Sequence, residues 1–331
     1  MSAFVYLLTC FLLKSAFLCT FHASTVQSAG DEKRARDLLQ GLSCEGGPCS
    51  LGAGEAHTCV LLHGATSGVV RCWGNDEYGQ LGRGNATSMS LQDQDLSVPE
   101  EAIEFGGSVW KLSVGAFHNC ALRTNGSVGC WGSGANGRLG NGNILSVGYA
   151  LGSMPPGAVH LNDSAIAISA GEDHTCAVLQ NGTVHCWGGN AFGQLGYGHS
   201  RSIGDEAGEM PPPAVDLGVY KAMQVTAGSL HTCVLTEPHR LVLCWGDSRF
   251  GQAGPIDHVG FSTFIGDEAA EMPPRPLQIG ALAEQVSAGC GHTCVILSQS
   301  YDLVCFGHNR RTLEEAKGAR VLGARWRTPR G

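Results

Sequence analysis

Short runs that mix apolar and polar residues recur along the chain and predict β-strands in pairs. Residues 174–179 read His-Thr-Cys-Ala-Val-Leu, residues 183–187 read Thr-Val-His-Cys-Trp, and Gln180-Asn181-Gly182 separates them. Runs of this length and composition are typical of strands, and glycine supplies the positive φ that a tight loop needs. The segment therefore predicts a β-hairpin with a three-residue loop.

The same hairpin recurs five times. Each unit has Ala-Gly or Val-Gly, two variable residues, His, Thr or Asn, and Cys, and later Cys, Trp or Phe, and Gly. The histidines of the five units are His57, His118, His174, His231 and His292. Units of this length, built from short strands and glycine turns, are typical of propeller blades rather than of helical repeats. The sequence therefore predicts an all-β protein, a β-propeller of about five blades over residues 51–309.

Each unit carries two cysteines that are expected to face each other on neighbouring strands. Counting outward from the loops places Cys176 opposite Cys186 and Cys233 opposite Cys244, although the two loops differ in length. Directly opposed residues on antiparallel strands are close enough for a disulfide. The predicted pairs are Cys59–Cys72, Cys120–Cys130, Cys176–Cys186, Cys233–Cys244 and Cys294–Cys305.

Metal binding is the alternative use of these cysteines. His57, Cys59 and Cys72 could supply three ligands, but structural zinc sites use four, usually with C-x-x-C pairs, which favours disulfides. Outside the repeats, Cys44 and Cys49 could pair with each other. Cys290 would then be left over, either as a free thiol or as an intermolecular link.

The aromatic residue that follows the second cysteine points to the other side of the sheet, because side chains alternate along a strand. We expect these residues to pack between neighbouring blades; stacking on carbohydrate is the alternative. They are Trp73, Trp131, Trp187, Trp245 and Phe306. The recurring histidines are expected to be structural, because an active site is one place whereas these occupy five equivalent places.

The N-terminus predicts export. Residues 1–28 are mostly apolar, end in small residues and resemble a signal peptide, with an uncleaved membrane anchor as the alternative. Residues 29–50 are interpreted as a linker, and no later segment is long and apolar enough to cross a bilayer. Regular cysteine pairs favour an oxidising compartment. The expected location is secreted or in the endomembrane lumen, or cytoplasmic if residues 1–28 are not a signal.

Four Asn-x-Ser/Thr sequons agree with export and predict a glycoprotein. Their asparagines are Asn85, Asn125, Asn162 and Asn181.

Charge is unevenly distributed. Residues 310–331 carry seven Lys/Arg and two Glu, whereas the rest carries 14 basic and 27 acidic residues, a net charge of −13. An acidic body repels phosphate backbones, so nucleic acid is a poor candidate partner. The basic tail is expected to be a disordered, solvated end; binding to an acidic partner is the alternative.

A glycine-leucine turn follows four of the five hairpins. These turns read Gly79-Gln-Leu-Gly82, Gly137-Arg-Leu-Gly140, Gly193-Gln-Leu-Gly196 and Gly251-Gln-Ala-Gly254. Together with Ala-Gly-x-x-His-Thr-Cys and Cys-Trp-Gly, they resemble the regulator-of-chromosome-condensation repeat over about residues 50–309, and the related β-lactamase inhibitor protein II superfamily. The resemblance implies four-stranded blades around a central channel. Family propellers usually have seven blades, so a ring of five closes as it is, stays open or is incomplete.

Two connections between hairpins repeat an acidic pattern. Residues 203–212 read Ile-Gly-Asp-Glu-Ala-Gly-Glu-Met-Pro-Pro, and residues 265–274 differ from them at one position. Long loops on a rigid scaffold often carry binding residues. The candidate partner-binding residues are Asp205, Glu206, Glu209, Asp267, Glu268 and Glu271. A calcium site is less favoured, since the ligand alternation of known calcium loops is absent.

These patterns predict a non-catalytic secreted or endomembrane scaffold that binds a protein partner and needs no cofactor. The alternative, by family analogy alone, is a guanine-nucleotide exchange factor or regulator for a small GTPase, which would need a reducing compartment and free thiols. An enzyme is disfavoured, because no nucleophile elbow, phosphate-binding loop or H-E-x-x-H motif is present.

Overall fold

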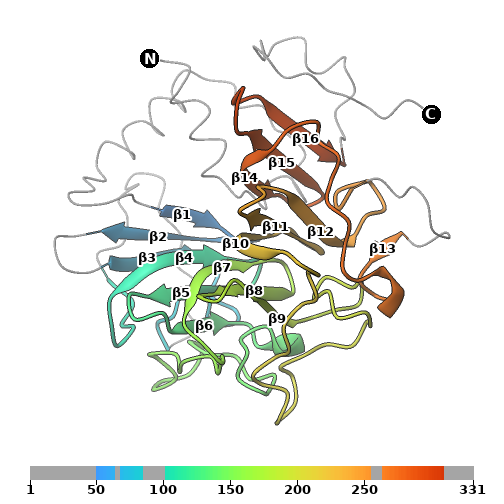
Figure 1. Ribbon diagram of the computed structural model, residues 1–331. Coiled ribbons are helices and arrows are strands. Elements are labelled where there is room, and N and C mark those ends of the chain that lie inside the picture. The colour runs from blue at the N-terminus through green and yellow to red at the C-terminus, as the bar shows by residue number, and fades with distance from the viewer. Residues whose placement is uncertain (1–49, 64–67, 85–100, 255–262, 309–331) are drawn as a thin grey trace.

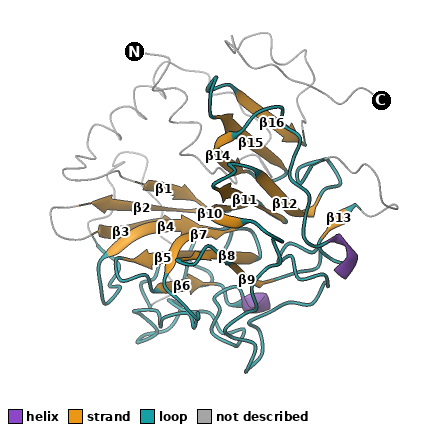
Figure 2. Cartoon of the chain, viewed as in Figure 1, coloured by secondary structure: helices purple, strands orange, loops and turns teal. Residues whose placement is uncertain are grey.

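Five antiparallel sheets follow one another around an arc, from β1 to β16 (Figure 1). The computed structural model describes residues 50–63, 68–84, 101–254 and 263–308. The predictions for residues 1–28, for the linker as far as residue 49, for the tail after residue 309, and for Cys44, Cys49 and Asn85 lie outside these ranges. The prediction of an all-β protein with about five blades is confirmed, since strands and loops make up almost all of the described chain (Figure 2).

Each blade contributes three principal strands. The first blade has β1 (Ser50–Ala53), β2 (His57–His63) and β3 (Gly68–Gly74); the second β4 (Val109–Val114), β5 (His118–Arg123) and β6 (Val128–Gly132); the third β7 (Ala165–Ala170), β8 (His174–Leu179) and β9 (Val184–Gly188); the fourth β10 (Lys221–Ala227), β11 (His231–Glu237), β12 (Val242–Asp247) and β13 (Phe264–Ile265); the fifth β14 (Ala283–Ala288), β15 (His292–Leu297) and β16 (Leu303–Gly307). Two short 3-10 turns are η1 (Ala135–Gly137) and η2 (Ala269–Glu271).

In the second, third and fourth blades the outermost position of the described sheet is short. The fourth blade has a named fourth strand, β13, in which Ile265 pairs with Gly246. The second and third blades have a single bridge at the same place, from Gly132 to Val147 and from Gly188 to Ile203. Further along, the outer segments of the first four blades each make a backbone bond of 2.8–2.9 Å to the third strand, as Val159 N does to Val128 O. The sheets therefore have three or four strands, and the outer position is mostly loop.

The hairpins have the predicted register. In the third blade Cys176 pairs with Cys186 across the loop, where Gly182 has a φ of +83°. In the fourth blade Cys233 pairs with Cys244, despite the longer loop. Loop length and the alternation of side chains determine this register within each blade.

The hydrophobic core is divided among the blade junctions. Four buried clusters each combine residues of two consecutive blades; the one between the second and third blades joins Leu122 and Val128 to Ile168 and Trp187. A blade cannot bury its apolar faces alone, so neighbouring blades stabilise each other, as in other repeat proteins.

The first strands of successive blades pack side by side, from β1 to β4, β7, β10 and β14. Side-chain hydroxyl groups form hydrogen bonds between these strands. Each accepts a bond of 2.9–3.0 Å from a backbone N–H of the next blade: Ser113 from Ala170, Ser169 from Ala227 and Thr226 from Ala288. No comparable contact joins β14 back to β1 within the described part of the chain. Among the described residues, no helix is long and apolar enough to span a membrane.

Candidate interaction surface

All five predicted cysteine pairs are brought together. Their Sγ atoms are 2.00–2.14 Å apart and their Cα atoms 4.1 Å apart, from Cys59–Cys72 in the first blade to Cys294–Cys305 in the fifth. Within the described ranges, no group of three or more His, Cys, Asp or Glu side chains could hold a metal ion. The geometry therefore matches disulfides rather than the zinc alternative.

The repetition of the histidines predicted a structural role, and four of the five bond to the next blade. His174 Nε2 lies 2.9 Å from the Thr232 hydroxyl of the following blade, and that hydroxyl donates to the carbonyl oxygen of Gln194 at 2.8 Å. We call this set of three residues a blade latch. The others are His118–Thr175–Arg138, His231–Thr293–Gln252 and His57–Asn119–Gln80, with histidine distances of 2.8–2.9 Å.

The latch determines which ring nitrogen of each histidine carries the proton. Because Thr175 donates its only hydroxyl proton to Arg138 O, its oxygen must accept from His118 Nε2–H. The Nδ1 atoms of His57, His118 and His231 are buried without a hydrogen-bond partner among the described residues. Burial lowers the pKa of His57 and His231 to about 4 and that of His118 well below its usual value. Burial thus favours the neutral form of His57, His118 and His231, in keeping with a structural role.

The tryptophans strengthen the same junctions. Trp187 is fully buried, and its Nε1–H donates to Arg138 O at 3.0 Å, the same carbonyl oxygen that Thr175 contacts. Trp131 and Trp245 repeat this contact with Gln80 O and Gln194 O. The prediction that these residues pack between blades is confirmed. Trp73 and Phe306, at the two ends of the arc, are only half-buried.

Some latch residues were not recognised from the sequence. The residue after each histidine belonged to the repeat, but nothing in its spacing indicated a partner in the preceding blade. The hydroxyls of Ser113, Ser169 and Thr226, which bond to the first strand of the next blade, were also missed. The sequence pattern that could have indicated them is a Ser or Thr two residues before the repeated glycine. That glycine lies against the histidine ring, and a Cβ on Gly171 would lie within 2.8 Å of His174 and Gly228 atoms.

The two ends of the blades form different faces. The second strand of each blade begins at its histidine and the third ends at a glycine, so the Gly-x-x-His turns and the Gly-Gln-Leu-Gly turns lie at the same end. We call this end the turn face. The loops between second and third strands lie at the opposite end, the hairpin face, which in the second and third blades comprises residues 124–127 and 180–183.

Aromatic side chains gather on the turn face. Tyr78 and Phe117 of neighbouring blades meet edge to face, with ring centroids 5.9 Å apart. Phe192 packs in the same way against Phe264 at 5.2 Å, and the Arg249 guanidinium lies 5.1 Å from the Phe192 ring. Tyr78 and Phe250 are 38 % and 53 % exposed. Amphipathic rings held rigidly at a surface are the residues that protein interfaces favour.

Carboxylates lie along the row of Gly-x-x-His turns on this face. Backbone bonds link the turns in a row, with Glu55 N donating to Ala116 O at 2.9 Å and Glu172 N to Ser229 O at 3.3 Å. Burial, and then the like charge of Asp173 and Glu55, raises the pKa of Glu172. Arg138 forms an ion pair with Asp173. The turn face thus combines aromatic rings with negative charge.

The acidic loops contact the turn face, but three of their six candidate residues, Glu209, Glu268 and Glu271, are used internally. Glu209 Oε2 accepts bonds from the backbone N–H groups of Gly204 and Glu206, at 2.7 and 3.1 Å, and Glu271 does the same in the fourth blade. A Cβ on Gly137, which has a φ of +73°, would overlap the backbone of residues 204 and 205, so this loop packs tightly against the preceding blade.

Four of the acidic candidates divide into two groups by exposure. Glu206 and Glu268 are exposed, and Asp205 and Asp267 are half-buried. Burial and the neighbouring Glu271 carboxylate raise the pKa of Asp267. The Glu268 carboxylate also accepts a bond from the backbone N–H of Glu271, in a capping box. Both Glu206 and Glu268 lie at the surface.

Three sequons lie together on the hairpin face. Asn125 and Asn181 are exposed at the tips of their hairpins, and each Oδ1 accepts bonds from the backbone and the hydroxyl of the Ser or Thr two residues later. Asn162 is also exposed, in a segment next to the first of these hairpins, since Ala165 N donates to Gly126 O at 2.9 Å. The three asparagines therefore point to one end of the second and third blades.

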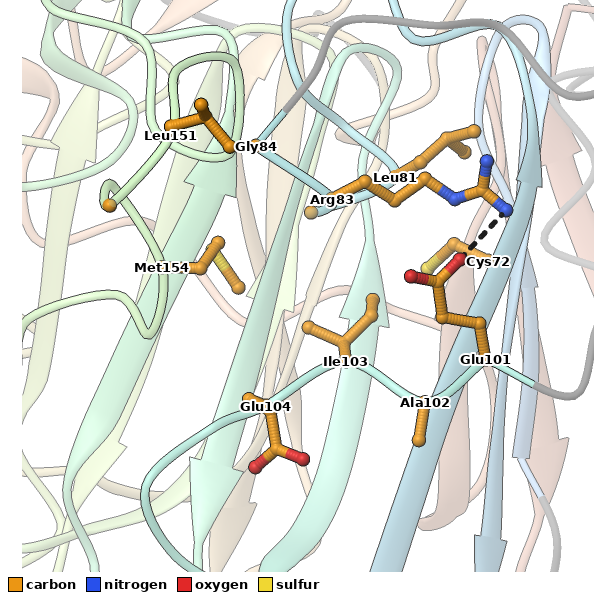
Figure 3. Close-up of a pocket in the computed structure, with 12 residues that line it drawn as sticks. Cys72, Leu81, Arg83, Gly84, Glu101, Ala102, Ile103, Glu104, Leu151 and Met154 are labelled. Atoms are coloured by element: carbon orange, nitrogen blue, oxygen red, sulfur yellow. Dashed lines mark ion pairs between the residues drawn. The ribbon is translucent and has the colours of Figure 1, made fainter.

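A shallow pocket of about 270 Å³ lies between the outer parts of the first two blades. Figure 3 shows its apolar side chains, among them Leu81, Ile103 and Met154. Arg83 and Glu101 point toward each other across it and form an ion pair of 3.4 Å (Figure 3). No histidine or nucleophilic side chain lines the pocket apart from Cys72, which is already disulfide-bonded.

The bonding state of Cys290 excludes one of the two states expected for it, the free thiol. It lies in the turn between β14 and β15, accepts a hydrogen bond of 3.1 Å from the Ser229 hydroxyl, and is disulfide-bonded. The alternative that it remains a free thiol was therefore wrong.

Comparison with known proteins gives the family. Models of the regulator of chromosome condensation (RCC1) repeat match residues 67–122, 125–178 and 181–235, and a second RCC1 repeat model matches residues 224–252. The chain belongs to the RCC1 repeat family. The matches run from β3 of the first blade through the fourth blade, a stretch that contains the three fully buried tryptophans.

Relatives of this RCC1 repeat protein include the ultraviolet-B receptor UVR8 of Arabidopsis thaliana, 31 % identical over 78 % of this chain and 53 % of UVR8. The probable E3 ubiquitin-protein ligase HERC6 of Homo sapiens is also 31 % identical, over 78 % of this chain and 23 % of HERC6. The chain thus spans about half the length of UVR8 and less of HERC6.

Two solved structures share its fold. Human WBSCR16 is 21 % identical, with a TM-score of 0.57 over 78 % of this chain and 62 % of that one. Prp20p of Saccharomyces cerevisiae is 20 % identical, with a TM-score of 0.56 over 78 % of this chain and 57 % of that one.

Proposed function

We propose that this RCC1 repeat protein is a non-catalytic scaffold of the secreted or endomembrane compartment, and that it binds a protein partner with its turn face. The observation that carries the proposal is the contrast between the two faces. Aromatic rings that pair between neighbouring blades, together with exposed acidic loop residues, lie on the turn face, whereas three sequons occupy the hairpin face of the second and third blades.

The chemistry of both faces supports this assignment. Glycans on Asn125, Asn162 and Asn181 would cover the hairpin face and keep a partner away from those blades. On the turn face, the Tyr78–Phe117 pair offers rigid apolar area, and Glu206 and Glu268 offer charge at the rim. Such a surface suits a partner that presents apolar and basic side chains.

The proposed compartment rests on the cysteines and the N-terminal segment. Ten cysteines lie at disulfide distance, an arrangement that persists in oxidising environments. The exchange-factor alternative needs these thiols free, and no feature of the described surface favours it. The proposal of a non-catalytic role is supported by the use of the buried histidines in the latches.

Co-purification from the secretory fraction tests the proposal. The tagged wild-type chain is compared with a Tyr78→Ala/Phe117→Ala double variant and with Trp110→Ala, which removes an aromatic ring, 59 % exposed, near the hairpin end of β4. Proteins recovered with the wild type are identified by mass. We expect the double variant to lose the partner and Trp110→Ala to keep it. The opposite pattern, or retention of the chain in the cytosol with reduced cysteines, would contradict the proposal.

A further inference from the structure

A loop of the second blade exposes large apolar side chains on the turn face. They are Ile144, Leu145, Tyr149 and Leu151, with exposed fractions from 51 % for Tyr149 to 89 % for Leu151. We call residues 144–151 the apolar loop. A soluble protein seldom leaves several large apolar side chains exposed together except where a partner binds, so this loop is a candidate binding surface.

On one side, the apolar loop packs against the glycine turn of the first blade. A Cβ on Gly79 would overlap the backbone of Tyr149, so these two residues touch, and Tyr78 directly precedes Gly79. Leu151 lies beside Gly84, just after the same turn (Figure 3). The junction of the first and second blades therefore holds the loop next to Tyr78.

On the other side, the loop packs against the segment that follows β6 in its own blade. A Cβ on Gly134 would overlap the backbone of Leu145, and the preceding Ser133 N donates to Phe117 O at 2.9 Å. The loop is thus joined to the segments beside both Tyr78 and Phe117, whose rings meet edge to face. We call the apolar loop and these two rings together the apolar patch.

The corresponding loops of the third and fourth blades share the backbone of this loop but not its side chains. In all three, a glycine with a φ of +93° or +94° donates its N–H to the side chain five residues later. The pairs are Gly148–Ser153, Gly204–Glu209 and Gly266–Glu271. Residues 147–154 carry no charged side chain, whereas residues 203–210 and 265–272 carry three carboxylates each and no Lys or Arg.

The three loops follow one another along the turn face. Each packs on the glycine turn of the preceding blade, because a Cβ on Gly79, Gly137 or Gly193 would overlap the backbone of the loop. The apolar patch at the first junction is therefore followed by acidic loops at the second and third junctions. Glu206 and Glu268 are the exposed carboxylates of these two loops.

We infer that the turn face binds a polypeptide segment whose apolar side chains pack on the apolar patch and whose Lys or Arg side chains lie along the acidic loops. The inference rests on the proposed function, because it takes the turn face as the binding face. It adds which blades bind which part of the partner. Burial of apolar area supplies affinity, and opposite charges determine the orientation of the segment.

Charge decides the class of partner. Arg201 and Arg249 border the acidic loops, but Arg249 is ion-paired with Asp247, so negative charge predominates there. These loops repel anionic lipid headgroups and the phosphates of nucleic acids. A polypeptide with both apolar and basic residues is attracted by both parts of the surface.

Binding of a synthetic peptide to the purified full chain tests the inference. The probe is a fluorescein-labelled peptide with a half of Leu and Phe joined by Gly-Ser to a half of Lys. Two matched peptides replace Leu and Phe by Ser, or Lys by Gln. We expect the chain to bind the probe more tightly than either matched peptide, and less tightly as salt is raised. Equal binding of the Lys and Gln peptides, or no binding of the probe, would overturn the inference.

Two double variants locate the binding site. Leu145→Ser/Leu151→Ser should raise the Kd of the probe about tenfold, because both side chains lie in the apolar patch. Glu206→Gln/Glu268→Gln should raise the Kd and make it less dependent on salt. Glutamine keeps an oxygen for the backbone bond that Glu268 accepts. Wild-type affinity in both folded variants would refute the inference.

Matched controls come from the hairpin face. Val219→Ser removes an apolar side chain that is 90 % exposed just before β10, and Glu237→Gln removes an exposed carboxylate at the end of β11. Both should bind the probe as the wild type does. Vesicles of phosphatidylcholine and phosphatidylserine provide the competing surface. Sedimentation of the wild type with these vesicles, abolished in Leu145→Ser/Leu151→Ser, would assign the apolar patch to lipid instead.

The same variants separate this inference from the proposed function. A partner from the secretory fraction that is lost in Tyr78→Ala/Phe117→Ala, but kept in both double variants of the loops, would leave the proposed function standing and contradict the inference. Loss of that partner in the loop variants, together with the expected order of the three peptides, would support both.

Discussion

The imidazole Nε2 of His174 lies 2.9 Å from the hydroxyl oxygen of Thr232, a residue 58 positions later in the next blade. The hydroxyl donates a hydrogen bond to Gln194 O, a carbonyl oxygen that also accepts from Trp245 Nε1–H. The His-Thr-Cys motif of a blade thereby contributes to two junctions. Its histidine bonds to the following blade, and its threonine bonds to the preceding blade. The propeller is held together by the repetition of this arrangement.

Removing the threonine hydroxyl at a latch should destabilise the protein. Thr232→Val keeps the shape of the side chain but leaves His174 Nε2–H buried without its acceptor, which costs about 1–3 kcal/mol. Urea unfolding measures the loss as a lower midpoint. Thr58→Val is the matched control, because Thr58 is half-exposed and has no latch partner among the described residues. Equal losses in both variants would show that the latch bond contributes little.

The tryptophan at a complete latch should contribute more to the stability of the fold than the tryptophan of the first blade. Trp187→Phe removes the donor to Arg138 O and leaves space in a fully buried site, so we expect a loss of about 1–3 kcal/mol. Trp73→Phe, at a half-buried position, should cost less. Thermal unfolding of the two variants beside the wild type makes the comparison, and a larger loss in Trp73→Phe would contradict it.

Each disulfide within a blade should contribute to stability. Replacing Cys176 and Cys186 together by alanine opens a link with a sequence separation of 10, and we expect a loss of about 2–4 kcal/mol. Alanine is chosen because both residues are fully buried. Calorimetry under non-reducing conditions measures the change. If the wild type in a reducing agent keeps its Tm, while mass analysis shows free thiols, the disulfides are not what stabilises the blades.

Stability should fall as the pH is lowered through the range in which the unfolded histidines titrate. The pKa of His231 is about 4 in the folded protein and near 6.5 when unfolded, so the unfolded state binds more protons between these values. This histidine therefore contributes a stability present above pH 6.5 and lost as the pH falls toward 4, on the order of 3 kcal/mol. Tm measured from pH 7.5 to 4.5 reports the loss.

A variant isolates the contribution of the histidine. His231→Gln should be less stable than the wild type at pH 7.5 but should lose less stability on acidification. The raised pKa of Glu172 acts in the opposite direction and is common to both proteins, so the difference between them belongs to His231. His160→Gln, at an exposed position, should leave the wild-type pH profile unchanged. Parallel profiles for His231→Gln and the wild type would refute this account.

Much of the candidate surface depends on contacts that no local pattern reveals. Glu209 and Glu271 look like binding residues in the sequence, yet their carboxylates bind the backbone of their own loops. The grouping of Asn125 with Asn162 on the hairpin face depends on how the second blade meets the third. These relationships join residues far apart in the chain, and their geometry follows from the packing of whole blades.

By itself, the sequence determined the hairpins, their register, the five cysteine pairs and the burial of Trp131, Trp187 and Trp245. Each of these follows from side-chain alternation and loop length over 10–13 residues, a range in which the chain has few alternatives. Only the tertiary structure decided which groups meet across blades, such as His174 with Thr232, and which end of the blades is left for a partner. Those contacts arise when apolar faces pack, and packing selects partners by shape across tens of residues.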